Sequence, residues 1–124
     1  MTKDWRQIRD RLAAPLGGSW QWDGFGPDGI SGTDRTSCRS VLVTRADHED
    51  GADWLHASVA RRDRLPTYHD LTALKAAVWG DGGWAYQVFP SRDRHVSIHS
   101  YALHLWGRAD GKNVLPDFGE HGTI

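Results

Sequence analysis

The sequence contains one cysteine, almost no net charge and no long apolar run. Cys38 alone can form no disulfide within the chain and no cysteine-rich zinc site. The formal net charge of -1, with histidines neutral, excludes a global basic field that would attract nucleic acid or anionic lipid. No stretch approaches the roughly 20 apolar residues of a membrane span, and residues 1–6 carry charges where a signal peptide needs an apolar core. We therefore expect a cytoplasmic protein.

Several common catalytic motifs are also missing. The chain has no Walker-type glycine loop, no G-x-S-x-G motif and no paired cysteines. Its 124 residues, with 39% hydrophobic and 25% charged, fit one soluble domain, 1–124, with a single core. Tryptophan is abundant, and core packing is its ordinary role, although exposed tryptophans favour a binding surface. The seven are Trp5, Trp20, Trp22, Trp54, Trp79, Trp84 and Trp106.

An N-terminal helix is predicted over residues 2–14. Trp5, Ile8 and Leu12 recur at helical spacing, with charged residues between them. Pro15 and the two glycines after Leu16 are expected to end this helix.

A second helix is predicted over about 68–79. Thr67, with Asp70 three residues later, is a variant of the capping box. An apolar stripe follows, and Gly80 supplies the stop signal.

The rest of the chain favours strands. Its β-branched and aromatic runs are separated by turn residues, and the glycine- and aspartate-rich stretch 24–37 is predicted to be a long loop. With the two helices, this order predicts an α+β fold in which the helices pack on one face of a mostly antiparallel sheet. The expected strands are 19–23, 38–45, 53–61, 84–89, 95–98 and 101–106, followed by a loosely structured tail, 107–124.

Two predicted strands share an H-x-S pattern. His56 and Ser58 lie in the first, and His95 and Ser97 in the second. Residues two apart point to the same face of a strand, so each segment presents an imidazole beside a hydroxyl. An imidazole titrates near neutral pH and suits proton transfer, while a hydroxyl can hold a phosphate oxygen.

This pair is similar to the double H-x-[ST]-h signature of the two-histidine phosphoesterases. The resemblance implies that His56 and His95 exchange protons and that Ser58 and Ser97 grip phosphate oxygens, without a metal. The two histidines are 39 positions apart, and the chain between them holds only one predicted helix. That family has two pseudo-symmetric lobes and needs considerably more chain between its histidines. Ordinary polar positions on a sheet face remain the alternative explanation.

The other histidines and the arginines are candidate binding residues. His95, His99 and His104 lie close in sequence, but residues four apart in a strand are separated by about 13 Å, so we predict neither a metal site nor a cofactor. Three arginines near the end of the strand 53–61 are interpreted as a solvated strand end, with an anion site as the alternative. The candidate binding residues are Arg61, Arg62, Arg64, Trp20, Trp22, His99 and His104.

The stretch from Trp54 to Trp106 resembles a known family. Three phrases carry the resemblance: H-A-S-V-A-R-R-D-R-L-P at 56–66, Y-Q-V-F-P at 86–90, and H-V-S-I-H at 95–99 together with L-H-L-W at 103–106. They are similar to a small uncharacterised family found chiefly in actinobacteriophages and their hosts. The resemblance implies a phage or prophage accessory protein that acts in the bacterial cytoplasm.

These observations predict a small accessory protein that binds a host or phage macromolecule, in first place a protein. The alternative is a phosphoesterase that hydrolyses a cyclic or linear nucleotide phosphodiester. Nucleic-acid binding through the arginines is a third hypothesis, which the net charge of -1 disfavours. A homodimer stays open.

Overall fold

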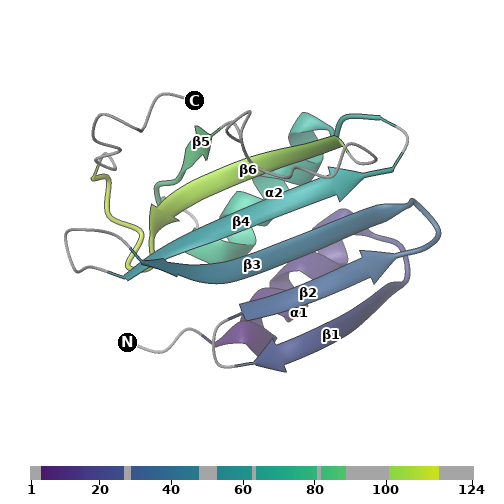
Figure 1. The fold of residues 1–124 in the computed structure, drawn as a ribbon, viewed down its shortest axis with the longest axis horizontal. Coiled ribbons are helices and arrows are strands. Elements are labelled where there is room, and N and C mark those ends of the chain that lie inside the picture. The colour runs from purple at the N-terminus through teal and green to yellow at the C-terminus, as the bar shows by residue number, and fades with distance from the viewer. Residues whose placement is uncertain are drawn as a thin grey trace.

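The computed structural model describes residues 4–26, 29–47, 53–62, 64–80, 82–88 and 101–114. Two helices and six strands make up this part of the chain (Figure 1). In chain order they are α1 (Trp5–Leu16), β1 (Trp20–Gly26), β2 (Gly29–Asp34), β3 (Arg39–Asp47), β4 (Asp53–Arg61), α2 (Tyr68–Trp79), β5 (Tyr86–Val88) and β6 (Tyr101–Arg108).

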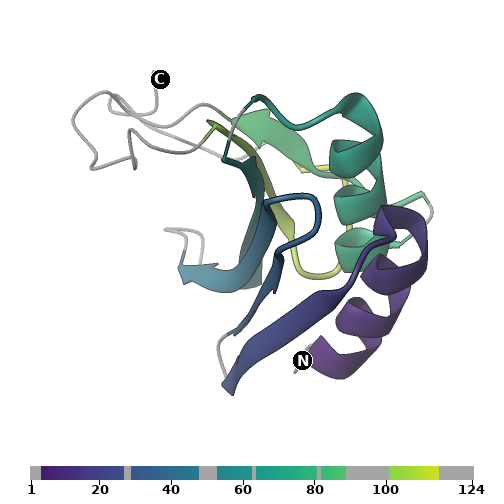
Figure 2. The ribbon, with the colours of Figure 1, turned by 90° about the vertical axis from the view of Figure 1, so that its right-hand side faces the viewer.

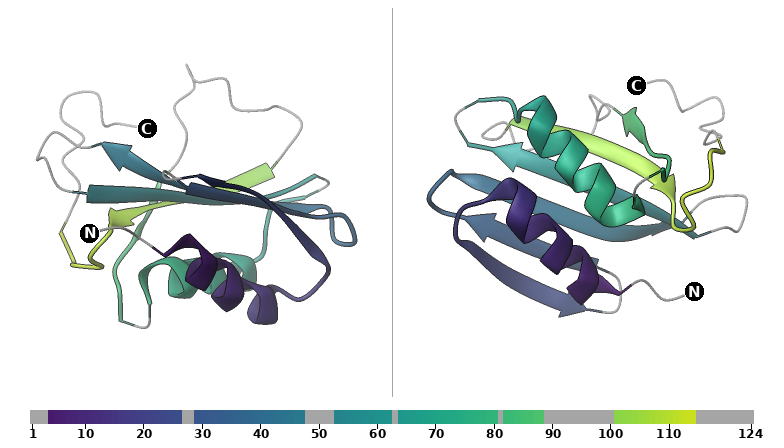
Figure 3. Two further views of the ribbon diagram at one scale, coloured as in Figure 1. Left: turned by 90° about the horizontal axis from the view of Figure 1, so that it is seen from below. Right: turned by 180° about the vertical axis from the view of Figure 1, so that it is seen from behind.

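The six strands form one antiparallel sheet in the order β1-β2-β3-β4-β6-β5. Both helices pack on the same face of this sheet, and the sheet curls around them (Figures 2 and 3). The predicted α+β architecture is therefore confirmed. We call the face that carries the helices the inner face and the opposite face the outer face.

Helix α1 begins at an N-cap that its own sequence supplies. The carboxylate of Asp4 accepts hydrogen bonds from the backbone N–H groups of Arg6 and Gln7. The helix continues through Pro15 to Leu16, so the prediction that Pro15 ends it was wrong, while Gly17 caps the C-terminus as predicted. A proline in the last turn removes one backbone donor only, and the burial of Leu16 holds that turn against the sheet.

Helix α2 has the predicted bounds because its signals are local. The Thr67 hydroxyl accepts a bond from the Asp70 N–H, and the Asp70 carboxylate accepts one from the Thr67 N–H, which completes the capping box. Gly80 ends the helix at a φ of 81°, a conformation that glycine adopts without strain.

The predicted loop over 24–37 is wrong, because β1 extends to Gly26 and β2 occupies Gly29–Asp34. Gly29 and Gly32 of this stretch are strand residues in close contact with neighbouring groups. A Cβ on Gly32 would lie 2.5 Å from the Trp22 ring, so glycine is needed where this ring crosses β2. Tertiary packing therefore overrides the low strand propensity of glycine.

The core lies between the helices and the inner face. Leu55, Ala57 and Val59 of β4 point inward and are fully buried, because alternate residues of a strand face the same side. Trp54, His56 and Ser58 take the outer face. The inward residues pack against Leu12 of α1, Leu74 of α2 and the rest of one apolar cluster, which includes Ile8, Ile30, Val41, Val43, Val78 and Leu105.

The C-terminal end of the sheet also differs from expectation. Strand β6 runs two residues past its predicted end, to Arg108, and Ala109 beyond it is buried, so the tail predicted from residue 107 begins as ordered structure. The predicted strand 95–98 and residues 115–124 lie outside the described residues. Within the part of the chain that the structure describes, no helix has the length and apolarity needed to cross a membrane.

Candidate functional site

The outer face of β4 and β6 brings two histidines into direct contact. In the antiparallel register His56 lies opposite Trp106, and Ser58 lies opposite His104, so the two histidines are diagonal neighbours. His56 Nε2 and His104 Nδ1 are 2.9 Å apart, a hydrogen-bond distance. Sequence spacing could not predict this pair, because its members are 48 residues apart.

The two imidazoles meet edge to edge in nearly one plane. Their planes differ by 8°, and their centres are 5.1 Å apart. This centre distance exceeds the 2.9 Å nitrogen distance by 2.2 Å, roughly twice the distance from an imidazole centre to its nitrogen. The nitrogens therefore point at each other, as in a straight N–H···N hydrogen bond, and do not converge on a third atom. One nitrogen carries the hydrogen and the other accepts it.

The environment keeps both rings neutral at neutral pH. Burial lowers the pKa of His104 below its ordinary value. Burial is also the main cause of the lowered pKa of His56, and the charge that His104 would carry lowers it further. Among the described residues, the buried Nε2 of His104 has no hydrogen-bond partner. The pair is thus a hydrogen-bonded neutral dyad, and protonation of both rings would set two N–H donors against each other.

Two tryptophans border the histidine pair on the same face. Trp54 and Trp106 stack with ring centres 5.7 Å apart, and Trp106 is also 6.4 Å from the His56 ring. Trp54 is fully buried although it points away from the core under the helices. We call Trp54, His56, His104 and Trp106 the outer-face cluster.

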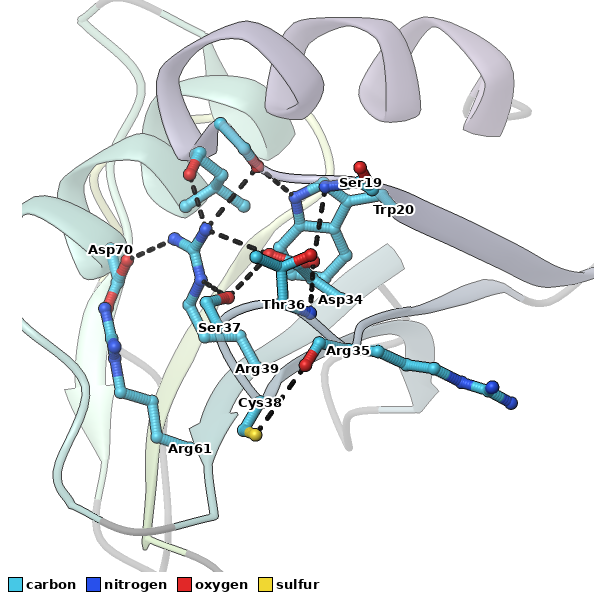
Figure 4. A network of polar contacts seen from close by, with 12 residues as sticks. Ser19, Trp20, Asp34, Arg35, Thr36, Ser37, Cys38, Arg39, Arg61 and Asp70 are labelled. Carbon is cyan, nitrogen blue, oxygen red and sulfur yellow. Dashed lines mark hydrogen bonds and ion pairs between the residues drawn. The ribbon is translucent and has the colours of Figure 1, made fainter.

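A second polar assembly lies at one end of the inner face and is buried. The guanidinium of Arg39 donates to Asp70 at 2.8 Å, to the carbonyl of Leu16 at 2.5 Å and to Asp34 at 3.4 Å (Figure 4). Arg61 approaches the other oxygen of Asp70 with two nitrogens, at 2.9 and 3.0 Å. Two arginines therefore balance two aspartates, and the assembly joins the end of α1, the start of α2 and strands β2 to β4.

Hydrogen bonds hold these carboxylates in the charged form. The pKa of Asp70 is lowered to about 2, because the bonds from Thr67, Arg61 and Arg39 outweigh the opposing effect of burial. Asp34 also has a lowered pKa, since bonds from Ser37 and from the backbone outweigh the effect of burial. Each arginine is paired with an aspartate inside the assembly, so no guanidinium is free to bind an external anion. The assembly therefore has a structural role, in which it connects the helices to the sheet.

The comparisons with known proteins give one match. A family model described as a domain of unknown function, DUF7694, matches residues 46–110, just over half of the chain. The chain belongs to the DUF7694 family. A search of curated proteins and a search of solved structures find no match.

The DUF7694 segment contains all four residues of the outer-face cluster. It also contains Asp70 and Arg61 of the buried assembly, whereas Asp34 and Arg39 lie before it. All four cluster residues therefore lie within the matched segment of this chain. The buried assembly connects this segment to the first part of the chain.

The structure describes two of the four predicted catalytic residues. His56 and Ser58 share the outer face as expected, but His95 and Ser97 lie outside the described residues, as does His99. His104, predicted as a binding residue, is the histidine that contacts His56. The period-two alternation in 101–106 put His104 and Trp106 on one face of a strand. It carried no signal for which strand would pair with it.

The remaining predicted binding residues divide by burial. The guanidinium of Arg61 is held by Asp70, while Arg62 and Arg64 are exposed. Trp20 and Trp22 stack 5.5 Å apart on β1 and are half-buried against the core. No three His, Cys, Asp or Glu side chains in the described ranges are placed to share a metal ion.

Proposed function

We propose that this protein is a binding module that recognises a partner protein through the outer face of β3, β4 and β6. The observation that carries the proposal is the outer-face cluster. It places Trp106 and two neutral histidines, all half-buried, on the sheet face opposite the helices, outside the core between the layers. Trp54 is fully buried and supports this surface by stacking on Trp106. Tryptophan is enriched among residues that dominate protein–protein binding energy.

The neighbours of the cluster support recognition of a protein. Leu42 of β3 lies opposite Ser58 and is 43% exposed, and the facing positions Ala60 and Ala102 are small. Apolar, aromatic and uncharged polar groups thus adjoin one another on this surface, as in the centre of a protein interface. Arg108, opposite Trp54, is the charged neighbour of the cluster, and its guanidinium pairs with Asp110 at 3.0 Å. A nucleic-acid site would instead need cations to contact phosphates.

The biological setting belongs to the same proposal. The resemblance of Trp54–Trp106 to an actinobacteriophage family supports an accessory role, encoded by a phage or a prophage, in the cytoplasm of an actinobacterial host. The partner is then a protein of the host or of the phage. We propose no cofactor for this role.

A pair of matched surface variants tests the proposal. Leu42→Lys places a charge beside the cluster, and Thr33→Lys places the same charge at an exposed outer-face position on β2. Neither side chain contributes to the core, so both variants are expected to fold. Wild-type protein and Thr33→Lys should capture the same partner from actinobacterial lysate, and Leu42→Lys should bind the purified partner at least about ten-fold more weakly. Equal binding by both variants, or no specific partner for the wild type, refutes the proposal.

The cluster also supports a second candidate function, hydrolysis of a nucleotide phosphodiester. Ser58 lies opposite His104 and on the same face as His56, so a hydroxyl adjoins the imidazole pair. Hydrolysis would need the rings to separate, because two histidines that act as base and acid must stand on either side of a phosphate. In this structure they bond to each other.

Turnover of cyclic dinucleotides and 2′,3′-cyclic nucleotides tests the second candidate. His56→Ala and Ser58→Ala should each abolish hydrolysis, while His69→Ala, a substitution of an exposed histidine on α2, should leave it unchanged. No turnover by the wild type, or equal turnover by all variants, removes this candidate.

A further inference from the structure

The sheet has two edges of very different character. The strand order makes β1 and β5 the outermost strands of the described sheet. Strand β5 has three residues, and short edge strands resist pairing with other chains. Strand β1 has seven residues, of which Trp20 to Asp23 pair with β2 in unbroken register before an irregularity at Asp23–Gly26. The β1 edge is therefore the longer template for an added strand.

Strand β1 has one of the usual devices that protect an edge, an irregularity between Asp23 and Gly26, and lacks the others. Its sequence, W-Q-W-D-G-F-G, contains no proline and no basic residue, and Asp23 is its only charge. Natural edges are commonly blocked by lysine, proline, an inward-pointing charge or a bulge in mid-strand. The irregularity of β1 lies towards its end, so the segment from Trp20 to Asp23 keeps outward-facing backbone donors and acceptors in regular order.

Two fixed tryptophans flank this edge on the inner face. The indole N–H of Trp20 donates to the Gly17 carbonyl at 2.7 Å, and the Arg39 guanidinium lies 5.4 Å from its ring. Trp22 stacks on Trp20 and fits over Gly32. Both rings stay half-buried in this arrangement, so they offer ordered apolar surface beside the open edge at little entropic cost.

We propose that β1 pairs antiparallel with β1 of a second copy of this chain, about a two-fold axis perpendicular to the sheet. Such an axis places the inner faces of both copies on the same side of the joint sheet. An inner-face residue of one copy can therefore lie opposite only an inner-face residue of the other. The register centred on the regular segment sets Gln21 opposite the partner's Gln21 and Trp22 opposite the partner's Trp20, and it extends by one residue to Ser19. Asp23 then faces Ser19 of the partner subunit, and no like charges are opposed.

A second copy suits this edge because the strand complements itself. Facing aromatic pairs across an antiparallel ladder are stabilising, and the stacked tryptophans of each copy would extend into one four-ring row. A foreign strand would need its own aromatic residues at the same spacing. The product is a twelve-stranded sheet with all four helices on one face, and because the interface is built on one strand pair, we expect micromolar affinity.

Matched lysine variants on the two edges test the pairing. Gln21→Lys on β1 and Gln87→Lys on β5 change exposed glutamines, so neither should lower the melting temperature appreciably. In sedimentation from roughly 1 to 300 µM, wild type and Gln87→Lys should show the same monomer–dimer equilibrium. Gln21→Lys should weaken the dimer about ten-fold or more, because two lysines then face each other across the axis.

Cysteine cross-linking tests the register. With Cys38→Ser as background, Gln21→Cys should form a disulfide-linked dimer under mild oxidation, since directly opposite Cβ atoms lie within about 5.5 Å. Gln87→Cys in the same background should stay monomeric.

Three outcomes overturn the proposal. They are a wild type that is monomeric throughout the concentration range, a dimer that Gln21→Lys leaves intact, and cross-linking that is equal at both edges. Binding of a foreign strand that Gln21→Lys abolishes, with the wild type monomeric, would assign the edge to another protein and also overturn self-pairing. None of these outcomes depends on the outer-face cluster, so failure here is distinct from failure of the proposed function.

Discussion

Replacing Asp70 by asparagine removes the charge at the centre of the buried assembly while it preserves side-chain size. The Asp70 carboxylate is 1% exposed and accepts four hydrogen bonds, from Arg39, from two nitrogens of Arg61 and from the Thr67 N–H. In Asp70→Asn, the buried Arg39 keeps only Asp34, at 3.4 Å, as a carboxylate partner. One positive charge is then uncompensated in a site with little access to water.

The size of the effect follows from the pKa and from the burial. A pKa of about 2, against an ordinary 3.8, means that the folded state favours the charged form of Asp70 by roughly 2 kcal/mol. Breaking a buried ion pair by removing one partner costs about 3–5 kcal/mol, because the other charge is left unpaired. We therefore expect the free energy of unfolding to fall by about 2–5 kcal/mol, a large share of the roughly 5–15 kcal/mol that stabilises a typical domain.

Urea unfolding near neutral pH measures this change. The matched control is Asp10→Asn, since Asp10 forms an exposed ion pair with Arg9, and its loss should cost less than about 1 kcal/mol. The pKa of Asp70 is lowered by folding, so its contribution is complete above the unfolded value and is lost as the pH falls. The difference between wild type and Asp70→Asn should thus shrink from about pH 4 towards pH 2. A loss below about 1 kcal/mol at neutral pH, or a difference that ignores pH, would refute the reasoning.

Two further predictions concern the outer-face cluster and Gly32 of β2, which contacts the Trp22 ring of β1. Folding lowers the pKa of His56 and His104, so the unfolded chain binds more protons and the free energy of unfolding should fall as the pH drops below about 6.5. His104→Gln should flatten this fall in urea titrations at a series of pH values, and an unchanged slope would contradict the assignment. Gly32→Ala should lower the free energy of unfolding by about 1–3 kcal/mol, because its Cβ would overlap the Trp22 ring. Thr33→Ala, at the exposed neighbouring position, should change the free energy of unfolding by less than about 0.5 kcal/mol. Equal losses for the two variants would show that overlap with the Trp22 ring is not the cause.

The parts of the fold that the sequence predicts are those built from local signals. Helix α2 follows from its capping box and Gly80, and β4 follows from the alternation of apolar and polar residues over 55–59. Strand β2 could not be found in this way, because its glycines lower strand propensity. Only the Trp22 ring, brought across by pairing with β1, makes glycine the required residue there.

The same limit applies to the candidate site. Alternation predicted that His56 and Ser58 lie on one face, and 101–106 was predicted as a strand. The contact between His56 and His104 depends on β4 pairing with β6 across the intervening helix, a register that no single segment encodes. The partner foreseen for His56 was His95, because a repeated pattern is visible in a sequence and strand pairing is not.

The buried assembly has a consequence for how freely this domain can be recombined. A chain cut at the start of the family segment, residue 46, would carry Asp70 and Arg61 but would leave Arg39 and Asp34 behind. The transplanted half would lose the guanidinium that also ties α2 to the end of α1 through the Leu16 carbonyl. Any N-terminal segment grafted onto it must supply a donor for the Asp70 oxygen that Arg39 holds, and must add no net charge to the buried site, because Arg61 already balances Asp70. The modular unit is thus larger than the family segment, and shuffling at its border is constrained by charge as well as by shape.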